Sequence, residues 1–594
     1  MPFTALRSSR LQAARWRLLI LLQAALLAAC TSTPLPPWTP TGSVATVPPA
    51  GQAPVPSLPG VPGMPQSVVT PSASVAPAVP LPYSAAVAAR FPAPSLVYST
   101  PGLQTGRSSY TTQSEIQTWL REQSIAAMRT AGVQAAILSI GQSQSGQPLQ
   151  ALVLTRAPAT SAAALQAYGK PTVMLIGQQH GDEPAGSEAL LVIARELSQG
   201  LLQPLLDNIN VLIVPRANPD GAASNQRATA GGLDMNRDHL LLNTPEAQAL
   251  ARLARDYQPT VVVDAHEYTV IGRFLEKFGH IQKFDALLQY SSTANAPEFL
   301  TKAAEEWYRR PALAALKAQG LSSEWYYTTS NDPADRKVSM GGTQPDTGRN
   351  VFGLKNAVSL LVESRGIGIG RLDLQRRVHT QVTVISSALA STSQRAAELM
   401  QLRPYIDKEI SALACTGQAV VEAAATPAQY DLVMLDPVTG ADKTLIVDWD
   451  SSLALRTLKT RARPCGYWVA ETAANVVERL RLHGVQVMRI AESGSVLSDS
   501  YKEIARADGE RRDVRGVIAD SNGIITVQVA LLRGLVDVPR GSYYIPLNQP
   551  LSNLVIAALE PDTPSSFFAN RLLPSLQTSV RVMGQPSVRM EGLP

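Results

Sequence analysis

The sequence predicts an α/β domain built on an open sheet, followed by a smaller α+β unit. Two observations carry this prediction. From about residue 108 to residue 400, short apolar segments alternate with longer amphipathic ones, which is typical of a sheet covered by helices. Near residue 400 the alternation gives way to strand-like pieces mixed with one amphipathic helix.

The expected elements follow from hydrophobic periodicity and from turn residues. In the first unit, apolar runs predict strands at residues 135–140, 149–155, 173–176, 210–214, 261–263 and 358–362. Amphipathic spacing predicts helices from about residue 114 and at 186–197 and 245–257. In the second unit we expect strands at 431–435, 445–447 and 526–529, and a helix at 473–482.

The first residues are typical of an export signal. Arginines precede an apolar run, Leu18 to Ala29, which is shorter than the about 20 residues that span a bilayer as a helix. The L-A-A-C of residues 27–30 resembles the lipobox of bacterial lipoproteins, which implies a lipoprotein signal peptide at 1–29 and a lipid on Cys30. The alternative is a plain signal peptide whose cleavage lies near a cysteine. Thr31, in place of an aspartate, favours the outer membrane, so we expect a bacterial envelope protein anchored there and facing the periplasm, or a secreted one.

A proline-rich segment follows the signal. Residues 31–100 hold 17 of the 44 prolines and one charged side chain, Arg90. Such a segment buries too little apolar surface to offset its ordering entropy, so residues 30–105 are expected to be a disordered tether. The predicted catalytic domain is then 106–400, and the accessory domain 401–594.

Charge and cysteine content narrow the partners and the stabilising bonds. A net charge of +5 over 594 residues, with no run of Lys and Arg in the folded part, argues against a nucleic-acid partner. Besides Cys30, the chain holds Cys415 and Cys465, in a compartment that permits disulfides. A bridge between them would close a loop of about 50 residues, worth roughly 4 kcal/mol. The alternative is two buried thiols.

Residues able to bind a metal lie where apolar strands end. Strand 173–176 leads to His180 and Glu183, strand 261–263 leads to His266, and strand 358–362 runs into Glu363. The carboxyl ends of strands in an open sheet form one crevice, so these residues are expected to meet. Two imidazoles and a carboxylate with a fourth position left for water suit a catalytic zinc, which lowers the pKa of that water to about 7. Glu363 would then act as general base and pass the proton to a leaving amine.

Taken in order, these residues resemble the zinc carboxypeptidase family typified by pancreatic carboxypeptidase A, over roughly residues 108–385. The resemblance implies a mixed, largely parallel sheet flanked by helices, one Zn²⁺ ion and a peptide substrate with a free C-terminal carboxylate. The matching motifs are the turn at 141–148, H-x-x-E at 180–183, N-P-D-G at 218–221, D-A-H at 264–266 and E-S-R-G at 363–366.

The resemblance also assigns roles to polar residues between the motifs. Arg227 falls where the family has the arginine that polarises the scissile carbonyl, and Asn236 with Arg237 match the pair that grips the terminal carboxylate. The planar fork of a guanidinium pairs bidentately with a carboxylate, which fits Arg237 for that task. The alternative for Arg237 is an ion pair with a flanking aspartate, Asp234 or Asp238.

The sequence departs from the family at the substrate side. Asp182 stands between the ligands, where the pancreatic enzymes have an arginine, and residues 328–362 contain no counterpart of the family's substrate-loop tyrosine. Tyr326 and Tyr327 lie further upstream, and Tyr268 follows the third ligand. Arg349 and Asn350 either meet the substrate terminus or belong to a plain loop.

The sequence therefore predicts a zinc metallocarboxypeptidase that hydrolyses C-terminal peptide bonds of envelope peptides, bound to the membrane through its N-terminal lipid. Two other hypotheses remain. One is a zinc-dependent amide deacylase acting on an acylated amino acid. The other is a non-catalytic lipoprotein that binds peptides or peptidoglycan, against which the complete ligand set argues.

Overall fold

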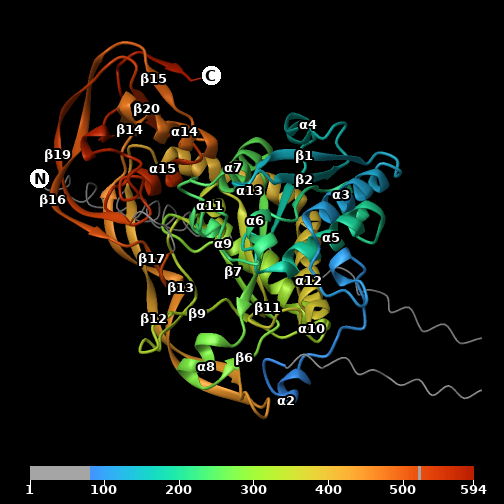
Figure 1. Ribbon diagram of the computed structural model, residues 1–594. Helices are drawn as coiled ribbons and strands as arrows, with labels where there is room; N and C mark the ends of the chain where they lie inside the picture. The colour runs from blue at the N-terminus through green and yellow to red at the C-terminus, as the bar shows by residue number, and fades with distance from the viewer. Residues whose placement is uncertain (1–80, 519–522, 594) are drawn as a thin grey trace, which may run out of the picture. The chain divides into compact units, whose positions relative to one another are not determined.

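The computed structural model describes residues 81–518 and 523–593 (Figure 1). The predicted signal peptide, Cys30 and residues 30–80 of the predicted tether lie outside them. The described residues belong to one compact unit. Among them, no helix combines the length and the apolar character needed to cross a bilayer.

The catalytic part is built on an eight-stranded mixed sheet, which confirms the predicted α/β fold. Its four inner strands run parallel, and the next strand on each side runs antiparallel to them. The inner strands β3 and β4 are buried along their whole length, as expected for parallel strands covered on both faces. The strand order is β1 (Gln134–Gln142), β2 (Pro148–Thr155), β4 (Asn210–Val214), β3 (Thr172–Gly177), β5 (Val261–Thr269), β11 (Val358–Ile367), β7 (Ala286–Tyr290) and β8 (Ser323–Trp325).

Helices cover both faces of this sheet. On one face, Met174 and Val262 share an apolar cluster with Leu250 of α7 (Pro245–Tyr257). Because side chains alternate along a strand, Ala265 of β5 points to the opposite face, where it contacts α5 (Pro184–Gln199). The contact is so close that a Cβ on Gly186 would lie 2.9 Å from that of Ala265, which fixes α5 against the end of β5. Besides α5, this part contains α3 (Gln113–Ala127), α12 (Leu374–Gln394) and α11 (Gly348–Leu354).

The accessory domain is a second sheet with two helices, α14 (Ala474–His483) and α15 (Ser552–Leu559). This agrees with the predicted α+β character. The strands, in their order across the sheet, are β19 (Ile524–Val538), β16 (Gly494–Gly509), β21 (Ser579–Val582), β14 (Gly466–Val469), β20 (Tyr543–Pro546), β15 (Met488–Ile490) and β22 (Met590–Gly592).

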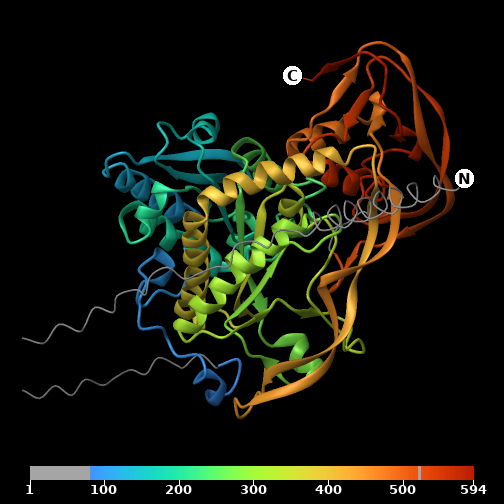
Figure 2. The ribbon, with the colours of Figure 1, turned by 180° about the vertical axis from the view of Figure 1, so that it is seen from behind.

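The two parts are joined more closely than a boundary at residue 400 implies. That boundary falls inside one helix, α13 (Ala396–Ala412), the yellow-orange helix that runs towards the accessory sheet in Figure 2. Two long strands, β12 (Gln418–Leu435) and β13 (Asp442–Ala462), then form a hairpin that extends alongside the catalytic part (Figure 1). The hairpin pairs there with β6 (Ile281–Gln282) and β10 (Val338–Ser339). One five-stranded sheet therefore contains strands of both predicted domains.

The prediction of a disordered tether is wrong for residues 81–105. Tyr83, Val87 and Phe91 are buried in an apolar cluster that also contains Trp449 of β13. The guanidinium of Arg365 lies over the ring of Phe91, 4.0 Å from its centre. The aromatic side chains supply apolar area that the proline-rich average composition conceals.

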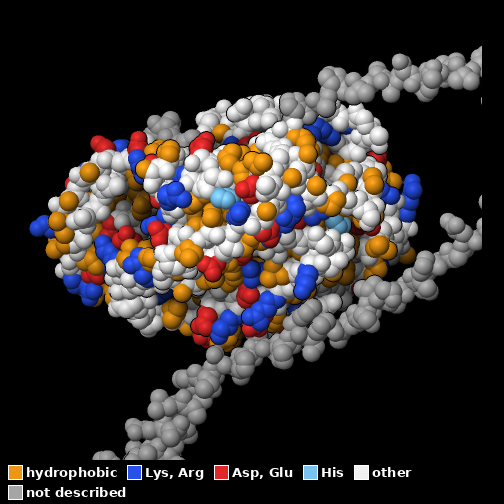
Figure 3. Space-filling view, turned by 90° about the horizontal axis from the view of Figure 1, so that it is seen from below, with side chains coloured by type: hydrophobic (Ala, Val, Ile, Leu, Met, Phe, Trp, Pro, Cys, Tyr) orange, Lys and Arg blue, Asp and Glu red, His pale blue; other side chains and the backbone are white. Residues whose placement is uncertain are grey.

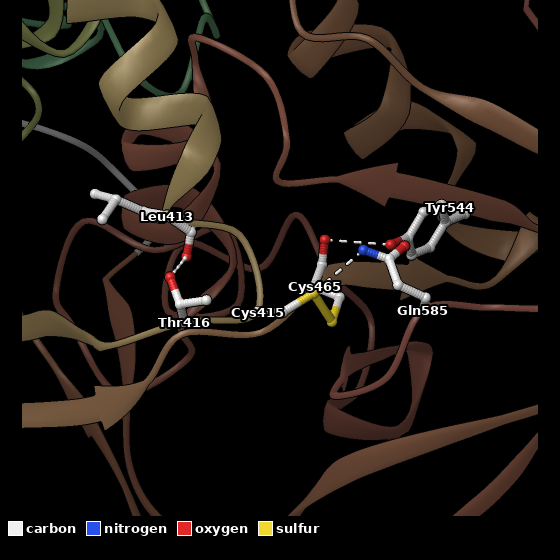
Figure 4. The surroundings of a disulfide bond; sticks show 6 residues. All are labelled: Leu413, Cys415, Thr416, Cys465, Tyr544 and Gln585. Carbon is white, nitrogen blue, oxygen red and sulfur yellow. Dashed lines mark hydrogen bonds between the residues drawn. A yellow bond between two sulfur atoms is a disulfide. The ribbon is translucent and has the colours of Figure 1, made fainter.

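Cys415 and Cys465 form a disulfide, which is the first of the two predicted alternatives. Their Cα atoms are 4.2 Å apart, and the bond joins the segment after α13 to the segment after β13 (Figure 4). The carbonyl of Cys465 accepts a hydrogen bond from the Tyr544 hydroxyl at 3.2 Å, and Gln585 donates to the sulfur of Cys415. The bridge thus lies where the long hairpin enters the accessory sheet.

Candidate metal centre and active site

Three buried side chains converge at the carboxyl ends of β3 and β5. Nδ1 of His180 lies 2.7 Å from Oε1 of Glu183, and Nδ1 of His266 lies 2.8 Å from Oε2 of the same carboxylate. The two Nδ1 atoms are 3.1 Å apart. His180 follows β3, Glu183 directly precedes α5, and His266 belongs to β5, so sheet and helix together fix the three positions.

The donor set fits a single zinc ion. Ligands on a tetrahedron with zinc bonds of 2.0–2.1 Å are roughly 3.3 Å apart, which is close to the separations found here. Burial would lower the pKa of His266, but Asp264 and Glu183 raise it well above its ordinary value. The carboxylates of Asp264 and Glu183 thus favour a positive charge at this position, which suits the binding of a cation.

A carboxylate stands behind each histidine. Nε2 of His266 lies 3.0 Å from Oδ1 of Asp264, and Nε2 of His180 lies 3.1 Å from Oδ1 of Asp234. Gln179 donates a hydrogen bond to Asp264 at 2.7 Å. With Nε2 directed to a carboxylate, Nδ1 of each ring is left for the metal.

Glu363 lies beside the three ligands because of strand pairing. In the parallel pair of β11 and β5, Glu363 is the register partner of His266. Its side chain is buried, and its Oε2 makes no hydrogen bond with any described residue. Burial and the charge of Glu183 raise the pKa of Glu363 to about 7, a suitable value for a general base at neutral pH.

Arg227 reaches the same centre from the loop after α6 (Pro219–Ser224). Its Nη1 lies 3.1 Å from Nδ1 of His180 and 3.3 Å from Oε1 of Glu183. Its Nε and Nη2 donate to Oδ2 of Asp234 at 3.0 and 2.8 Å, which fixes the guanidinium plane. A positive charge therefore stands at the edge of the metal site.

Asn236 and Arg237 are also in the site, with a partner that was not expected. Nδ2 of Asn236 lies 3.2 Å from Nε2 of His266, and Nη1 of Arg237 donates to the Asn236 carbonyl at 2.7 Å. Neither flanking aspartate is bonded to Arg237 by its side chain. Instead, the guanidinium donates to Asp513 of the accessory domain, with Nε at 2.9 Å.

The remaining candidate residues are Arg349, Asn350 and three tyrosines, and they differ in whether they lie near the site or hold a neighbouring segment. Asn350 donates to the carbonyls of Gly342 and Gln344, so it holds a loop and does not extend into the site. Arg349 lies 5.8 Å from the centre of the Tyr326 ring. All three tyrosines belong to one buried apolar cluster. Tyr268 donates to the Phe284 carbonyl, and the Tyr326 hydroxyl lies 3.5 Å from Nη2 of Arg515.

Two kinds of residue at the site have no role predicted from the sequence. Asp264 shares a strand face with His266, and the D-x-H spacing was a signal that could have identified it. Asp513 and Arg515 had no such signal, because 276 residues separate Asp513 from its partner Arg237.

Comparisons with known proteins agree with this centre. Residues 122–366 match the family model for zinc carboxypeptidase. The chain is 27% identical over 411 residues to carboxypeptidase 2 of Trichophyton rubrum, which covers 68% of this chain and 74% of that protein. It is 41% identical over 101 residues to carboxypeptidase D of Mus musculus, 15% of this chain and 7% of the relative.

Among solved structures, a metallo-carboxypeptidase from Pseudomonas aeruginosa in complex with (2-guanidinoethylmercapto)succinic acid is similar, with a TM-score of 0.35 and 17% identity. The match covers 49% of this chain and 70% of that one. The family model over residues 122–366 and the relatives, together with the His-Glu-His centre, show a zinc carboxypeptidase domain in this chain and support a zinc-dependent metallocarboxypeptidase.

Proposed function

We propose that the protein removes the C-terminal residue from peptides of the cell envelope, with Glu363 as general base. The observation that carries the proposal is a buried carboxylate in register with His266, whose Oε2 makes no hydrogen bond with any described residue. His180, Glu183 and His266 would hold the zinc ion. When bound there, zinc would supply Lewis-acid chemistry and lower the pKa of water to about 7.

The other residues of the site orient the substrate and move its protons. Glu363 accepts a proton from the attacking water and delivers it to the leaving amine. The guanidinium of Arg227 is placed to stabilise negative charge on the scissile carbonyl oxygen, a contribution typically worth a factor of about 100 to 1,000 in rate. Arg237 and Asn236 bind the terminal carboxylate, since a planar guanidinium pairs with both oxygens.

The envelope location is supported by the N-terminal sequence, where Cys30 stands in a lipobox-like L-A-A-C. Peptides released from peptidoglycan fit that location. Mass spectrometry of the N-terminal peptide tests the anchor: a diacylglyceryl group on Cys30 is expected, and a free thiol there would exclude it.

Glu363→Gln separates the base from the metal site. The variant is expected to keep stoichiometric zinc and to lose a factor of about 100 to 10,000 in kcat, the range for general acid–base catalysis. Glu276→Gln, at an exposed position, serves as the control with unchanged kcat. Retained activity in Glu363→Gln would remove Glu363 from its assigned role.

Requirement for a free terminus is tested with a peptide and its C-terminally amidated twin. The proposal expects cleavage of the acid and a large loss of kcat/KM for the amide. Equal rates on the two would instead favour an amidase that does not read the terminal carboxylate.

A further inference from the structure

The accessory domain reaches the catalytic centre through the end of one long hairpin. Strands β16 and β19 pair over most of their length. Between them in the sequence lie two short strands, β17 (Arg512–Asp513), labelled in Figure 1, and β18 (Gly516–Val517). The two short strands pair with each other. Residues 511–517 are called the β17–β18 hairpin below.

The first contact of this hairpin is with the proposed carboxylate-binding residue. Asp513 accepts hydrogen bonds from both Nε and Nη2 of Arg237. Each of the two side chains is 11% exposed, so the ion pair is largely withdrawn from water. The other carboxylate oxygen of Asp513 accepts from the backbone N–H of Arg515 at 2.7 Å, which orients the group towards Arg237.

Further contacts hold the hairpin against the site. Arg511 donates to the carbonyl of Arg237 and pairs with Asp346 at 2.9 Å. The N–H of Asn331 donates to the carbonyl of Arg515 at 2.8 Å. The Arg515 guanidinium extends inward, with Nη2 3.5 Å from the Tyr326 hydroxyl. The hairpin is therefore fitted to the substrate side of the centre at several points.

An aspartate side chain and a peptide C terminus carry the same chemical group. A guanidinium fork whose Nε and Nη2 are engaged by one carboxylate cannot offer the same pair of donors to a second. We propose that the β17–β18 hairpin is an internal competitor of the substrate, in which Asp513 occupies on Arg237 the place of the terminal carboxylate. The inference rests on the proposed function, specifically on the role given to Arg237.

The competition has a definite consequence for binding. A group tethered to the same chain has an effective concentration in the millimolar range, so it weakens an incoming ligand without abolishing its binding. Peptides with a terminal carboxylate must displace Asp513, whereas amidated peptides gain nothing from its removal. A peptide therefore binds through its terminal carboxylate only if its affinity for Arg237 and Asn236 is high enough to displace Asp513.

Asp513→Asn tests this directly, because it keeps the size of the side chain and removes its charge. Peptide affinity is measured by calorimetry in zinc-loaded Glu363→Gln protein, so that no turnover occurs. We expect Asp513→Asn to tighten the free-acid peptide about tenfold and to leave its amidated twin unchanged. The matched control is Arg512→Gln in the same hairpin, an exposed residue paired with Glu510, which should alter neither affinity. An unchanged or weaker affinity for the acid peptide would overturn the proposal.

Arg237→Gln distinguishes this failure from a failure of the proposed function. If the acid peptide is preferred over the amide and Arg237→Gln abolishes the preference, Arg237 is the clamp, and the Asp513 result judges the hairpin alone. If the preference is absent or survives Arg237→Gln, the clamp assignment is wrong, and the competitor proposal falls with it.

Hydrogen–deuterium exchange gives an independent measurement on the unsubstituted hairpin. The N–H groups of Arg515 and Ile518 are bonded to Asp513 and to the Arg511 carbonyl. Saturating acid peptide, added to the zinc-loaded Glu363→Gln protein, should speed their exchange several-fold, and the amidated twin at equal occupancy should not. Unchanged exchange with the acid peptide bound would show that the hairpin stays in place, which contradicts the competition.

Discussion

Single residues behind the metal ligands carry much of the metal affinity in such a site. Asp264→Asn keeps the shape of the side chain at Nε2 of His266 but removes the negative charge that orients the ring and raises its basicity. Loss of such a partner typically weakens metal binding by 10- to 100-fold, and we expect that range for zinc. Competition with a chromophoric chelator measures it.

Asp256→Asn is the matched control, because Asp256 is exposed and its carboxylate pairs with its neighbour Arg255. It should leave the zinc affinity unchanged. An Asp264→Asn protein that binds zinc as tightly as the parent would mean that the ring of His266 is held by its other contacts.

Lys355 predicts a pH dependence of stability. Its ammonium group is buried and makes no hydrogen bond with the described residues, and burial together with the charge of Arg255 lowers its pKa from 10.5 to about 7. Between these two pH values the unfolded chain retains a proton that the folded protein loses, so stability rises with pH by up to about 1.4 kcal/mol per unit. Below pH 7 both states are charged, and the full penalty is present.

Lys355→Met removes this penalty. The variant should raise the free energy of unfolding by about 2–4 kcal/mol at pH 7 and below, and the gain should vanish as the pH approaches 10.5. Urea unfolding across this pH range measures it. Lys408→Met, at an exposed position on α13, should show no such trend, and a gain that is independent of pH would contradict the assigned cause.

The sequence predicts the residues of the centre well wherever they lie at strand ends. His180, Glu183, His266 and Glu363 follow apolar runs whose burial is a local property, and parallel pairing then brings them together. Asp513 belongs to a different sheet, and its position at Arg237 depends on how two long strands pair and pack, which no local pattern encodes.

At the scale of elements, the disulfide offers a direct measurement. Cys415 and Cys465 are separated by 50 residues, and a closed loop of about that length is worth roughly 4 kcal/mol in the chain-entropy model. The double variant Cys415→Ser, Cys465→Ser should therefore lower the free energy of unfolding by about 2–4 kcal/mol. Thermal unfolding with and without reductant checks it: reductant should lower the Tm of the parent and leave that of the double variant unchanged, and equal responses would contradict the expectation.

The sequence predicts closely the bounds of elements that have one apolar run or one apolar face. It does not predict the bounds of strands whose burial is irregular. Strand β4 and helix α7 occupy the predicted residues, because each has one continuous apolar run or one apolar face. The strands β12 and β13 are 18 and 21 residues long, but only their most apolar stretches were predicted. Their remaining parts alternate irregularly between buried and exposed positions. The sequence there therefore shows neither the two-residue period of a strand nor the 3.6-residue period of a helix.

At the scale of the whole molecule, the two predicted domains share their cores. Trp449 of the long hairpin packs in one cluster with Phe274 of the catalytic part, and Val351 packs in another with Tyr467 of the accessory sheet. Heating should therefore give one cooperative transition. Differential scanning calorimetry checks this, and two separated transitions would show that the parts unfold independently.

Because the two predicted domains share their cores, removal of the second should disrupt the fold of the first. A chain comprising residues 81–400 loses the strands that pair with β6 and β10 and cuts α13, and it should lack the near-UV circular dichroism of the parent. Residues 81–594 are the control and should retain it.

On the surface, the face in Figure 3 shows Lys and Arg side chains interspersed with Asp and Glu, so the charged groups there form no single patch of one sign.

The pairing between β5 and β11 fixes the position of Glu363 relative to His266. Glu363 faces His266 because five residues, Val358 to Val362, each pair with one residue of the neighbouring strand. Side chains alternate along a strand, so deletion of any one of the five would turn the carboxylate to the other face of the sheet. A substitution within residues 358–362 therefore leaves Glu363 beside His266, whereas an insertion or deletion of one residue there moves it away.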